Sequence, residues 1–405
     1  MRRQMAEQAH AEVEGESCGI HDIGTSGQGR LHTGAGRDNL LVAMRRAVRF
    51  LLAVVLAACC FAADRRVVAI GDLHGDLRGF LSLLQSAGLT DAKGKWTGGN
   101  SVLVQLGDVP DRGPDTRKIL DLLMDLQKEA LQAGGEVHPL IGNHEAMNVY
   151  GDLRYVTRAE FDAFRARNSR QLRDDFFRKQ PRELRPGPMD EDADRAGWEE
   201  RHPLGWVEHR LAMGPAGKYG SWIRSNEAVC KIDDSLFVHG GIAPKYGDWP
   251  LDKLNAAVRD DLGDFSKLKG GVVTDPDGPL WYRELARGAE AGLAAHVDSV
   301  LLRHGVKRIV VGHTPTPGAI LPRFRGKVIM ADVGISRAQG GRLACLLVEG
   351  DSVSALHRGR KLPLPQGGAV ELLAYLRTAA ALDPQPSPLR RLIQAVATAG
   401  VPATY

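Results

Sequence analysis

Residues 136–145 read EVHPLIGNHE, an apolar run that ends abruptly in an amide, an imidazole and a carboxylate. Short apolar runs that stop at glycine are typical of buried strands, and ligand-binding side chains gather at the exits of such strands. Taken alone, Asn143 and His144 could equally be a turn residue and a solvated histidine. The fold and the function therefore depend on whether the rest of the chain repeats this pattern.

The pattern recurs four times, in RVVAIGDLHGD (66–76), SVLVQLGDVPDRG (101–113), DSLFVHGG (234–241) and RIVVGHT (308–314). Each run is apolar or β-branched and ends in a loop with glycine beside a carboxylate or an imidazole. Residues 77–89, 116–131 and 289–305 carry apolar side chains at helical spacing between these runs. Strands that alternate with helices predict a layered α/β domain.

The composition is that of an ordinary globular protein: 405 residues, 43% hydrophobic and 25% charged. The net charge of +4 is small, and no long Lys/Arg block is interleaved with aromatic residues, so nucleic acid is not expected as a partner. Of five cysteines, Cys230 and Cys345 fall in the expected folded part, in apolar runs. They indicate small buried side chains rather than a disulfide framework.

The N-terminal region predicts export. Residues 1–43 lack hydrophobic periodicity, and Met44 opens MRRAVRFLLAVVLAACCFAA, with arginines ahead of a short apolar core. This is the build of a secretory signal and is short for a membrane span, so we expect an exported protein of the bacterial periplasm. Met44 is an alternative start of translation. Residues 56–59, LAAC, resemble a bacterial lipobox, so a lipid anchor at Cys59 and simple cleavage near Ala62 or Ala63 both remain open.

The expected organisation is therefore a disordered extension with a signal segment (1–64, signal 44–63), a catalytic domain (65–360) and a C-terminal helical tail (361–405). Within the domain, residues 152–219 are Arg- and Asp-rich with scattered aromatics, which predicts an insertion with one or two amphipathic helices. Two interpretations of the insertion stay open: a wall or lid over the substrate, and a solvated excursion without substrate contact.

Nine polar side chains follow the five strand exits: Asp72, His74, Asp108, Asp111, Arg112, Asn143, His144, His239 and His313. Carboxylates, imidazoles and a carboxamide suit borderline divalent metals such as manganese, iron or zinc. If the loops converge, the ligands suffice for two ions that share one carboxylate. Such a site stabilises the attacking and leaving oxygens of an in-line displacement, so the sequence predicts phosphoester hydrolysis.

The motifs GDLHGD, GDVPDRG, GNHE, HGG and GHT, in this order, resemble the signature of the phosphoprotein phosphatase family of calcineurin-like metallophosphatases. The fuller contexts GNHEAMN, LFVHGGI, GPLWYR and VVGHTPT are similar to its Shewanella-like protein phosphatase branch. The resemblance runs from about residue 67 to about residue 336. It implies a four-layer αββα sandwich of two mixed sheets flanked by helices, with the helical insertion and a dimetal site at the strand ends.

The resemblance also implies roles for individual residues. Six would hold two divalent ions, manganese first and iron or zinc as alternatives: Asp72 and His74 on one ion, Asp108 between both, and Asn143, His239 and His313 on the other. His144 would be the general acid, oriented by Asp111, and Arg112 would bind the phosphoryl oxygens. The family supplies a second phosphate-binding arginine, for which Arg283 is the first candidate and Arg224 the second.

These roles imply a phosphomonoesterase that acts by direct attack of a metal-bridging hydroxide, without a phosphoenzyme. Arg112 in the Asp-Arg-Gly sequence favours a phosphate monoester, so the expected substrate is a phosphoprotein carrying Ser/Thr or Tyr phosphate. A dinucleoside polyphosphate or another small phosphoester is the alternative substrate. A non-catalytic metal-binding protein is the remaining alternative, although every expected ligand type is present.

Overall fold

The computed structural model describes residues 65–179 and 191–399. The predicted signal segment, Met44 and Cys59 lie outside the described residues, so the prediction of export stays a prediction. No helix in the described ranges combines the length and the apolar character needed to cross a membrane.

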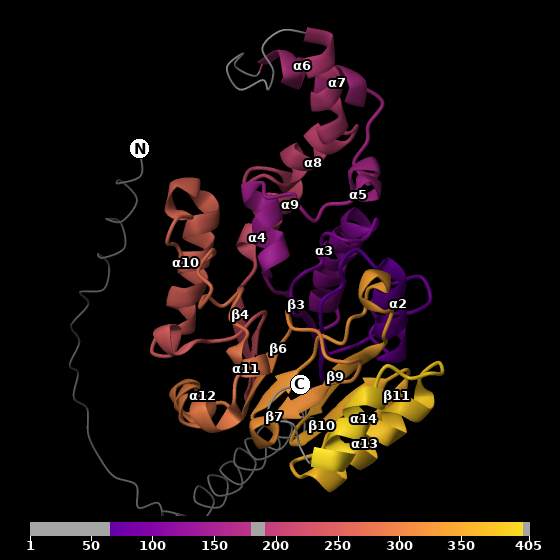
Figure 1. Ribbon diagram of the computed structural model, residues 1–405, viewed down its shortest axis with the longest axis vertical. Helices are drawn as coiled ribbons and strands as arrows, with labels where there is room; N and C mark the ends of the chain where they lie inside the picture. The colour runs from indigo at the N-terminus through magenta and orange to yellow at the C-terminus, as the bar shows by residue number, and fades with distance from the viewer. Residues whose placement is uncertain (1–64, 180–190, 400–405) are drawn as a thin grey trace, which may run out of the picture. The chain divides into compact units, whose positions relative to one another are not determined.

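Two mixed sheets form the centre of the described chain (Figure 1). The first has the order β11-β10-β9-β1-β2-β3 and the second the order β4-β5-β6-β8-β7. The strands of the first sheet are β1 (Val67–Ile70), β2 (Val102–Gln105), β3 (Glu136–Pro139), β9 (Ala344–Glu349), β10 (Ser352–His357) and β11 (Arg360–Pro363). Those of the second are β4 (Val229–Ile232), β5 (Ser235–Val238), β6 (Arg308–Val311), β7 (Leu321–Arg323) and β8 (Val328–Met330).

All five predicted strands are confirmed, as β1, β2, β3, β5 and β6. Within each sheet they pair in parallel, β1 with β2, β2 with β3 and β5 with β6. Parallel strands are covered on both faces, which explains why these segments read as continuous apolar runs. Parallel pairing also brings the carboxyl ends of the strands to the same edge of each sheet.

Helices flank the sheets, and their buried faces belong to the same apolar core as the strands. The predicted helices are confirmed as α2 (Leu77–Ser86), α3 (Thr116–Gln132) and α12 (Glu290–His304), and the C-terminal region forms α13 (Ala369–Leu382) and α14 (Arg390–Ala399). Further helices are α4 (Asn143–Tyr150), α10 (Leu251–Gly263) and α11 (Glu284–Arg287). The result is the predicted arrangement of two mixed sheets flanked by helices.

The insertion contains more helices than the sequence predicts. Its described part forms α5 (Arg158–Ala163), α6 (Ser169–Lys179), α7 (Glu191–Arg201) and α8 (Trp206–Met213), followed by α9 (Lys218–Ser225). The prediction of one or two helices was too low because these helices are short and polar, with little apolar periodicity. Phe161, Phe177, Trp198 and Val207 are buried but lie outside the main apolar cluster, so the insertion has a small core of its own.

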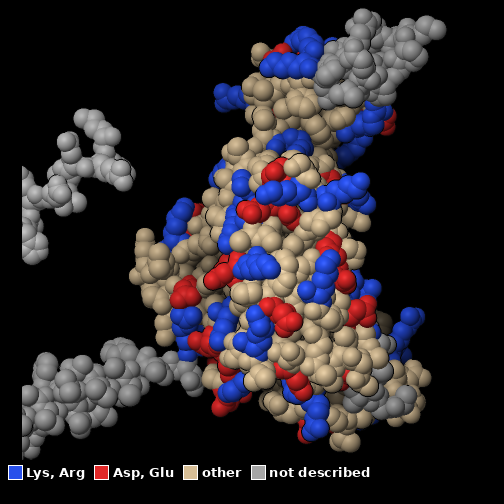
Figure 2. Space-filling model, turned by 90° about the vertical axis from the view of Figure 1, so that its left-hand side faces the viewer, with Lys and Arg blue, Asp and Glu red and all other residues tan. Residues whose placement is uncertain are grey.

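Acidic and basic side chains intermingle on the face shown in Figure 2. Surface ion pairs of the described chain include Lys307 with Asp351 and Lys245 with Asp275. This face therefore presents no extended area of a single charge.

Candidate active site

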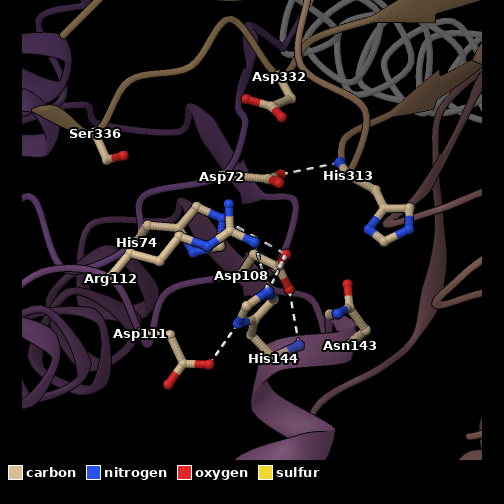
Figure 3. A network of polar contacts seen from close by, with 12 residues as sticks. Asp72, His74, Asp108, Asp111, Arg112, Asn143, His144, His313, Asp332 and Ser336 are labelled. Atoms are coloured by element: carbon tan, nitrogen blue, oxygen red, sulfur yellow. Dashed lines mark hydrogen bonds and ion pairs between the residues drawn. The ribbon is translucent and has the colours of Figure 1, made fainter. Parts of the chain in front are cut away.

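The loops that leave β1, β2, β3, β5 and β6 meet at one place, and all nine polar residues predicted from the strand exits lie there (Figure 3). β1 and β2 lead to Asp72 and Asp108, and α4 begins at Asn143 directly after the loop that follows β3. His239 follows β5 and His313 follows β6, so both sheets contribute. These residues are almost fully buried, except Arg112, which is exposed.

Glycine is needed beside several of them because the loops of the two sheets nearly touch. A Cβ atom added at Gly71 would lie 2.6 Å from the carbonyl oxygen of Ala331. One added at Gly107 would lie 2.6 Å from the backbone nitrogen of Gly142 and 2.9 Å from Nδ1 of His239. The repeated Gly-Asp pairs in the sequence therefore reflect close packing of backbone at the site.

Asp108 lies at the centre of the cluster. Its Oδ1 accepts a hydrogen bond from the backbone N–H of His144 at 3.0 Å and lies 3.2 Å from Nε2 of His239. Its Oδ2 lies 3.9 Å from Nε2 of His74. Potential ligand atoms fall into two groups that share this carboxylate, one with His74 and His144 and the other with His239 and His313. A shared carboxylate is what a bridging ligand requires.

Hydrogen bonds outside the cluster fix the histidine tautomers. Nδ1 of His239 lies 2.7 Å from the carbonyl oxygen of Leu106, and Nδ1 of His74 lies 3.1 Å from that of Pro110. A carbonyl can only accept, so in each ring Nδ1 carries a proton and Nε2 is the atom that faces Asp108. Burial lowers the pKa of His74 to about 3, which keeps this ring neutral, as a metal ligand must be.

The residues fit divalent metal ions. Nε2 of His239 has three proton acceptors around it: Oδ1 of Asn143 at 3.0 Å, Nδ1 of His313 at 3.1 Å and Oδ1 of Asp108. Lone pairs that converge in this way repel one another unless a cation or a proton lies among them. Buried Nε2 of His313 has no hydrogen-bond partner in the described chain. Imidazole, carboxylate and carboxamide donors together match manganese, iron or zinc.

The backbone at the site is strained. Five of the nine non-glycine residues with positive φ in the described chain belong to the predicted site: His74, Asp108, Asp111, Arg112 and His313. Each such residue costs about 1–3 kcal/mol and persists only where surrounding contacts enforce it. The fold therefore holds these side chains against their local backbone preference.

His144 lies between an anion and a cation. Its Nδ1 bonds to the carboxylate of Asp111, whose other oxygen accepts from Nδ2 of Asn148 at 3.0 Å. Its Nε2 lies 3.2 Å from Nη2 of Arg112. Burial alone would lower the pKa of His144, but Asp108 and Asp111 outweigh burial and raise the pKa above its ordinary value. A protonated imidazole can therefore face the substrate through Nε2.

Geometry alone also allows His144 to join His74 and Asp108 as a metal ligand. Arg112 argues against this, because its guanidinium lies at hydrogen-bond distance from Nε2 and takes up the space beside that atom. Asp111 meanwhile occupies Nδ1. The surroundings of His144 suit proton transfer better than metal binding.

A cavity of about 150 Å³ opens onto the cluster, and both Arg112 and Arg283 line it. Arg283 donates from Nη1 to the carbonyl oxygen of His313 at 2.6 Å and to Oγ1 of Thr314 at 3.1 Å. Arg224, the alternative, donates to the carbonyl oxygen of Pro215 and is absent from the cavity wall. Of the two candidates, Arg283 lies at the cavity and Arg224 does not. Arg287 and Gln339 also line the cavity, and no motif in the sequence predicts them there.

Sequence reasoning missed two buried carboxyl groups around the metal ligands. Glu145 accepts hydrogen bonds from the backbone N–H groups of Asp108, Val109 and Gly142 at 2.7–2.8 Å, and so ties two strand-exit loops together. Asp332, next to Asp72, accepts from the N–H of Gly334, and no donor among the described residues reaches its Oδ2 (Figure 3). Residues 328–334, VIMADVG, repeat the pattern of an apolar run before Asp and Gly, which is the signal that could have revealed Asp332.

Two further residues come from the insertion. Oε1 of Glu160 accepts from the N–H of Asp111 at 3.3 Å, and the carbonyl oxygen of Tyr155 accepts from the N–H of Arg112 at 3.1 Å. The insertion therefore contacts Asp111 and Arg112, the two residues between which the His144 ring lies. No pattern in the Arg- and Asp-rich sequence distinguishes Glu160 or Tyr155 from its neighbours.

Comparison with known proteins agrees with this chemistry. Residues 65–317 match the family model for calcineurin-like phosphoesterases. Shewanella-like protein phosphatase 2 of Arabidopsis thaliana is 34% identical over 303 residues, which cover 68% of this chain and 73% of that protein. Shewanella-like protein phosphatase 1 of Plasmodium berghei is 25% identical over 279 residues, 67% of each chain.

The crystal structure of a cold-active protein-tyrosine phosphatase from a psychrophilic Shewanella species has a similar fold. The TM-score is 0.57 at 30% identity, over 74% of this chain and 80% of that one. The chain belongs to the calcineurin-like phosphoesterases and, within them, to the Shewanella-like protein phosphatases. It is a metal-dependent phosphatase whose substrates are phosphoesters, and its His/Asp cluster is suited to divalent metal ions.

Proposed function

We propose that this enzyme removes phosphate from phosphorylated Ser, Thr or Tyr side chains of proteins. The observation that carries the proposal is the position of His144, held between Asp111 and Arg112 beside the ligand group centred on Asp108. A phosphomonoester releases an alkoxide or phenoxide, which leaves readily only if it is protonated. His144 supplies that proton from Nε2, while Asp111 keeps the ring oriented.

The size of the cavity supports a substrate that lies mainly outside it. A volume of about 150 Å³ is below the roughly 300–1,000 Å³ of pockets that enclose a whole small molecule. A terminal phosphoryl group fits such a space, with the rest of the substrate at the surface. The names of the similar proteins, protein phosphatases and a protein-tyrosine phosphatase, favour a phosphoprotein over a free nucleotide.

Asp72, His74, Asp108, Asn143, His239 and His313 would hold two divalent ions, and we propose manganese, with iron or zinc as alternatives. Bound there, the ions would polarise the phosphoryl oxygens and acidify the attacking water. Arg112 and Arg283 would bind the phosphoryl oxygens as planar forks, and burial of the ligand set would exclude bulk water from the reaction.

The experiment that tests the proposal measures steady-state hydrolysis, with added manganese, of a phosphotyrosine peptide, a phosphothreonine peptide and a dinucleoside tetraphosphate. We expect kcat/KM to be higher for at least one phosphopeptide than for the dinucleotide. Preference for the dinucleotide would overturn the protein-phosphatase assignment and keep only the metal chemistry.

We also propose that the protein is exported to the bacterial periplasm, with a lipid anchor at Cys59 as one form of attachment. The support is the signal-like sequence at residues 44–63. Mass spectrometry of the mature N-terminus from natural membranes and periplasm should show either diacylated Cys59 or a free terminus near Ala62. An intact N-terminus in the cytoplasmic fraction would contradict export.

A further inference from the structure

Tyr155 is an exposed aromatic side chain directly beside buried catalytic groups. It lies between α4 and α5, and 42% of its surface is exposed, whereas His144 is only 2% exposed. The rings of Tyr155 and His144 are 5.0 Å apart between centroids and tilted by 41°. No described residue hydrogen-bonds the Tyr155 hydroxyl, so neither burial nor a polar contact explains this ring.

Contacts with Arg112 hold Tyr155 in place. The backbone N–H of Arg112 donates to the carbonyl oxygen of Tyr155 at 3.1 Å, and the guanidinium carbon lies 5.4 Å from the centre of the ring. The hydrogen bond fixes the backbone of Tyr155, and the cation–π contact orients the face of its ring. The ring is therefore positioned before any substrate arrives, which reduces the entropy cost of binding against it.

The position of the ring corresponds to the leaving group. Asp111 occupies Nδ1 of His144, so the proton goes to the leaving oxygen from Nε2, next to Arg112. Arg112 and His144 line the phosphoryl cavity, while Tyr155 lies outside that wall and contacts both of them. Tyr155 therefore lies beside the proton donor at the cavity wall, where a leaving group that extends past Nε2 of His144 can reach its ring.

We infer that Tyr155 is a specificity-determining residue that contacts the leaving group and favours an aromatic leaving group over an aliphatic one. The inference rests on the proposed function and narrows it. An aromatic leaving group can stack on the Tyr155 ring, whereas a threonine side chain offers only a methyl group. Tyr155 would contact the substrate without taking part in proton transfer.

The test compares Tyr155→Leu and Tyr155→Phe with the unmodified full chain loaded with manganese. The substrates are two peptides that differ only in phosphotyrosine or phosphothreonine. Leucine still covers His144 but has no aromatic face, and phenylalanine restores the face without the hydroxyl. Phe265→Leu, which alters another exposed aromatic residue away from the cavity, is the matched control.

We expect Tyr155→Leu to lower kcat/KM for the phosphotyrosine peptide by about two- to tenfold, mainly through KM. The effect on the phosphothreonine peptide should be smaller, Tyr155→Phe should recover the activity, and Phe265→Leu should change neither substrate. An equal loss on both peptides would show that the ring only shields His144 and would overturn the inference, as would no loss on either.

The experiment also distinguishes failure of this inference from failure of the proposed protein-phosphatase function. If the unmodified enzyme cleaves neither peptide, the same variants are compared on naphthyl phosphate and glycerol phosphate. A loss of kcat/KM confined to naphthyl phosphate would support the role of Tyr155, while the proposal of a protein substrate would be abandoned. Equal losses on these two compounds would overturn both ideas.

Discussion

The two parts of the active site are supported by different regions of the chain. The metal-binding part comes from strand exits of both sheets and is tied together by main-chain contacts such as those of Glu145. The part around His144 is supported by the insertion, through Glu160 and Tyr155. The first part depends on the shared apolar core, whereas the insertion has a small core of its own. The comparison suggests that the sheets determine the reaction and the insertion determines which substrate reaches it.

The largest effect should come from the centre of the metal-binding part. Asp108→Asn removes the charge shared by both ligand groups, so we expect loss of both ions and of detectable turnover. Metal analysis of the purified variant measures this directly. Asp233→Asn is a suitable control because Asp233 is exposed and also has positive φ. A variant that still carries two ions would refute the bridging role.

Replacement of His144 should separate the two parts. His144→Asn removes the proton donor but leaves Asp108 and its histidine neighbours, so kcat should fall by about 10²- to 10⁴-fold with unchanged metal content. His304→Asn, in the last turn of α12, controls for loss of a histidine elsewhere. Loss of metal from the His144 variant would instead place this residue among the ligands.

Glu160 tests how the insertion supports the acid. Burial first, and Asp111 second, raise the pKa of Glu160 from its ordinary 4.5 to about 8. The folded protein keeps the proton that the unfolded chain releases, so stability falls as pH rises between these values. Glu160→Gln can still accept from Asp111 and cannot ionise.

We therefore expect the melting temperature of Glu160→Gln, relative to the unmodified protein, to rise between pH 4.5 and pH 8, with activity changed only a few-fold. Thermal unfolding at several pH values measures this difference. Glu371→Gln, an exposed change on α13, is the matched control for loss of a glutamate elsewhere. A difference at Glu160 that does not vary with pH would mean that Glu160 is ionised in the folded protein.

The smallest effect on the chemistry should come from the core of the insertion. Trp198 is buried against Phe177 and His202, and Trp198→Ala should destabilise this core by about 3–5 kcal/mol. Limited proteolysis should then cut the insertion faster, while kcat for naphthyl phosphate stays within about twofold. Trp198→Phe, a milder change at the same position, is the control for unfolding of the whole protein. Abolished turnover in both variants would show that the two parts are not separable.

The strand-exit part of the site was predictable because each ligand stands next to glycine at the end of an apolar run. The pairing of those strands into two sheets, and the antiparallel addition of β9, β10 and β11, depend on contacts distant in sequence. Glu160 and Tyr155 could not be predicted, since only the folded insertion brings them to Asp111 and Arg112. Asp332 could have been found, because β8 ends in the same way as the other strands.

The backbone N–H of His313 donates to Asp72, 241 positions earlier in the chain, and the two residues belong to different sheets. Two ions that share Asp108 would join the ligands that follow the first sheet to His239 and His313, which follow the second, and would so crosslink segments far apart in the chain. A ligand that binds only the folded chain adds about 4 kcal/mol of stability when present at a thousand times its Kd. The lifetime of this phosphatase would then depend on the metal supply of its surroundings as much as its activity does.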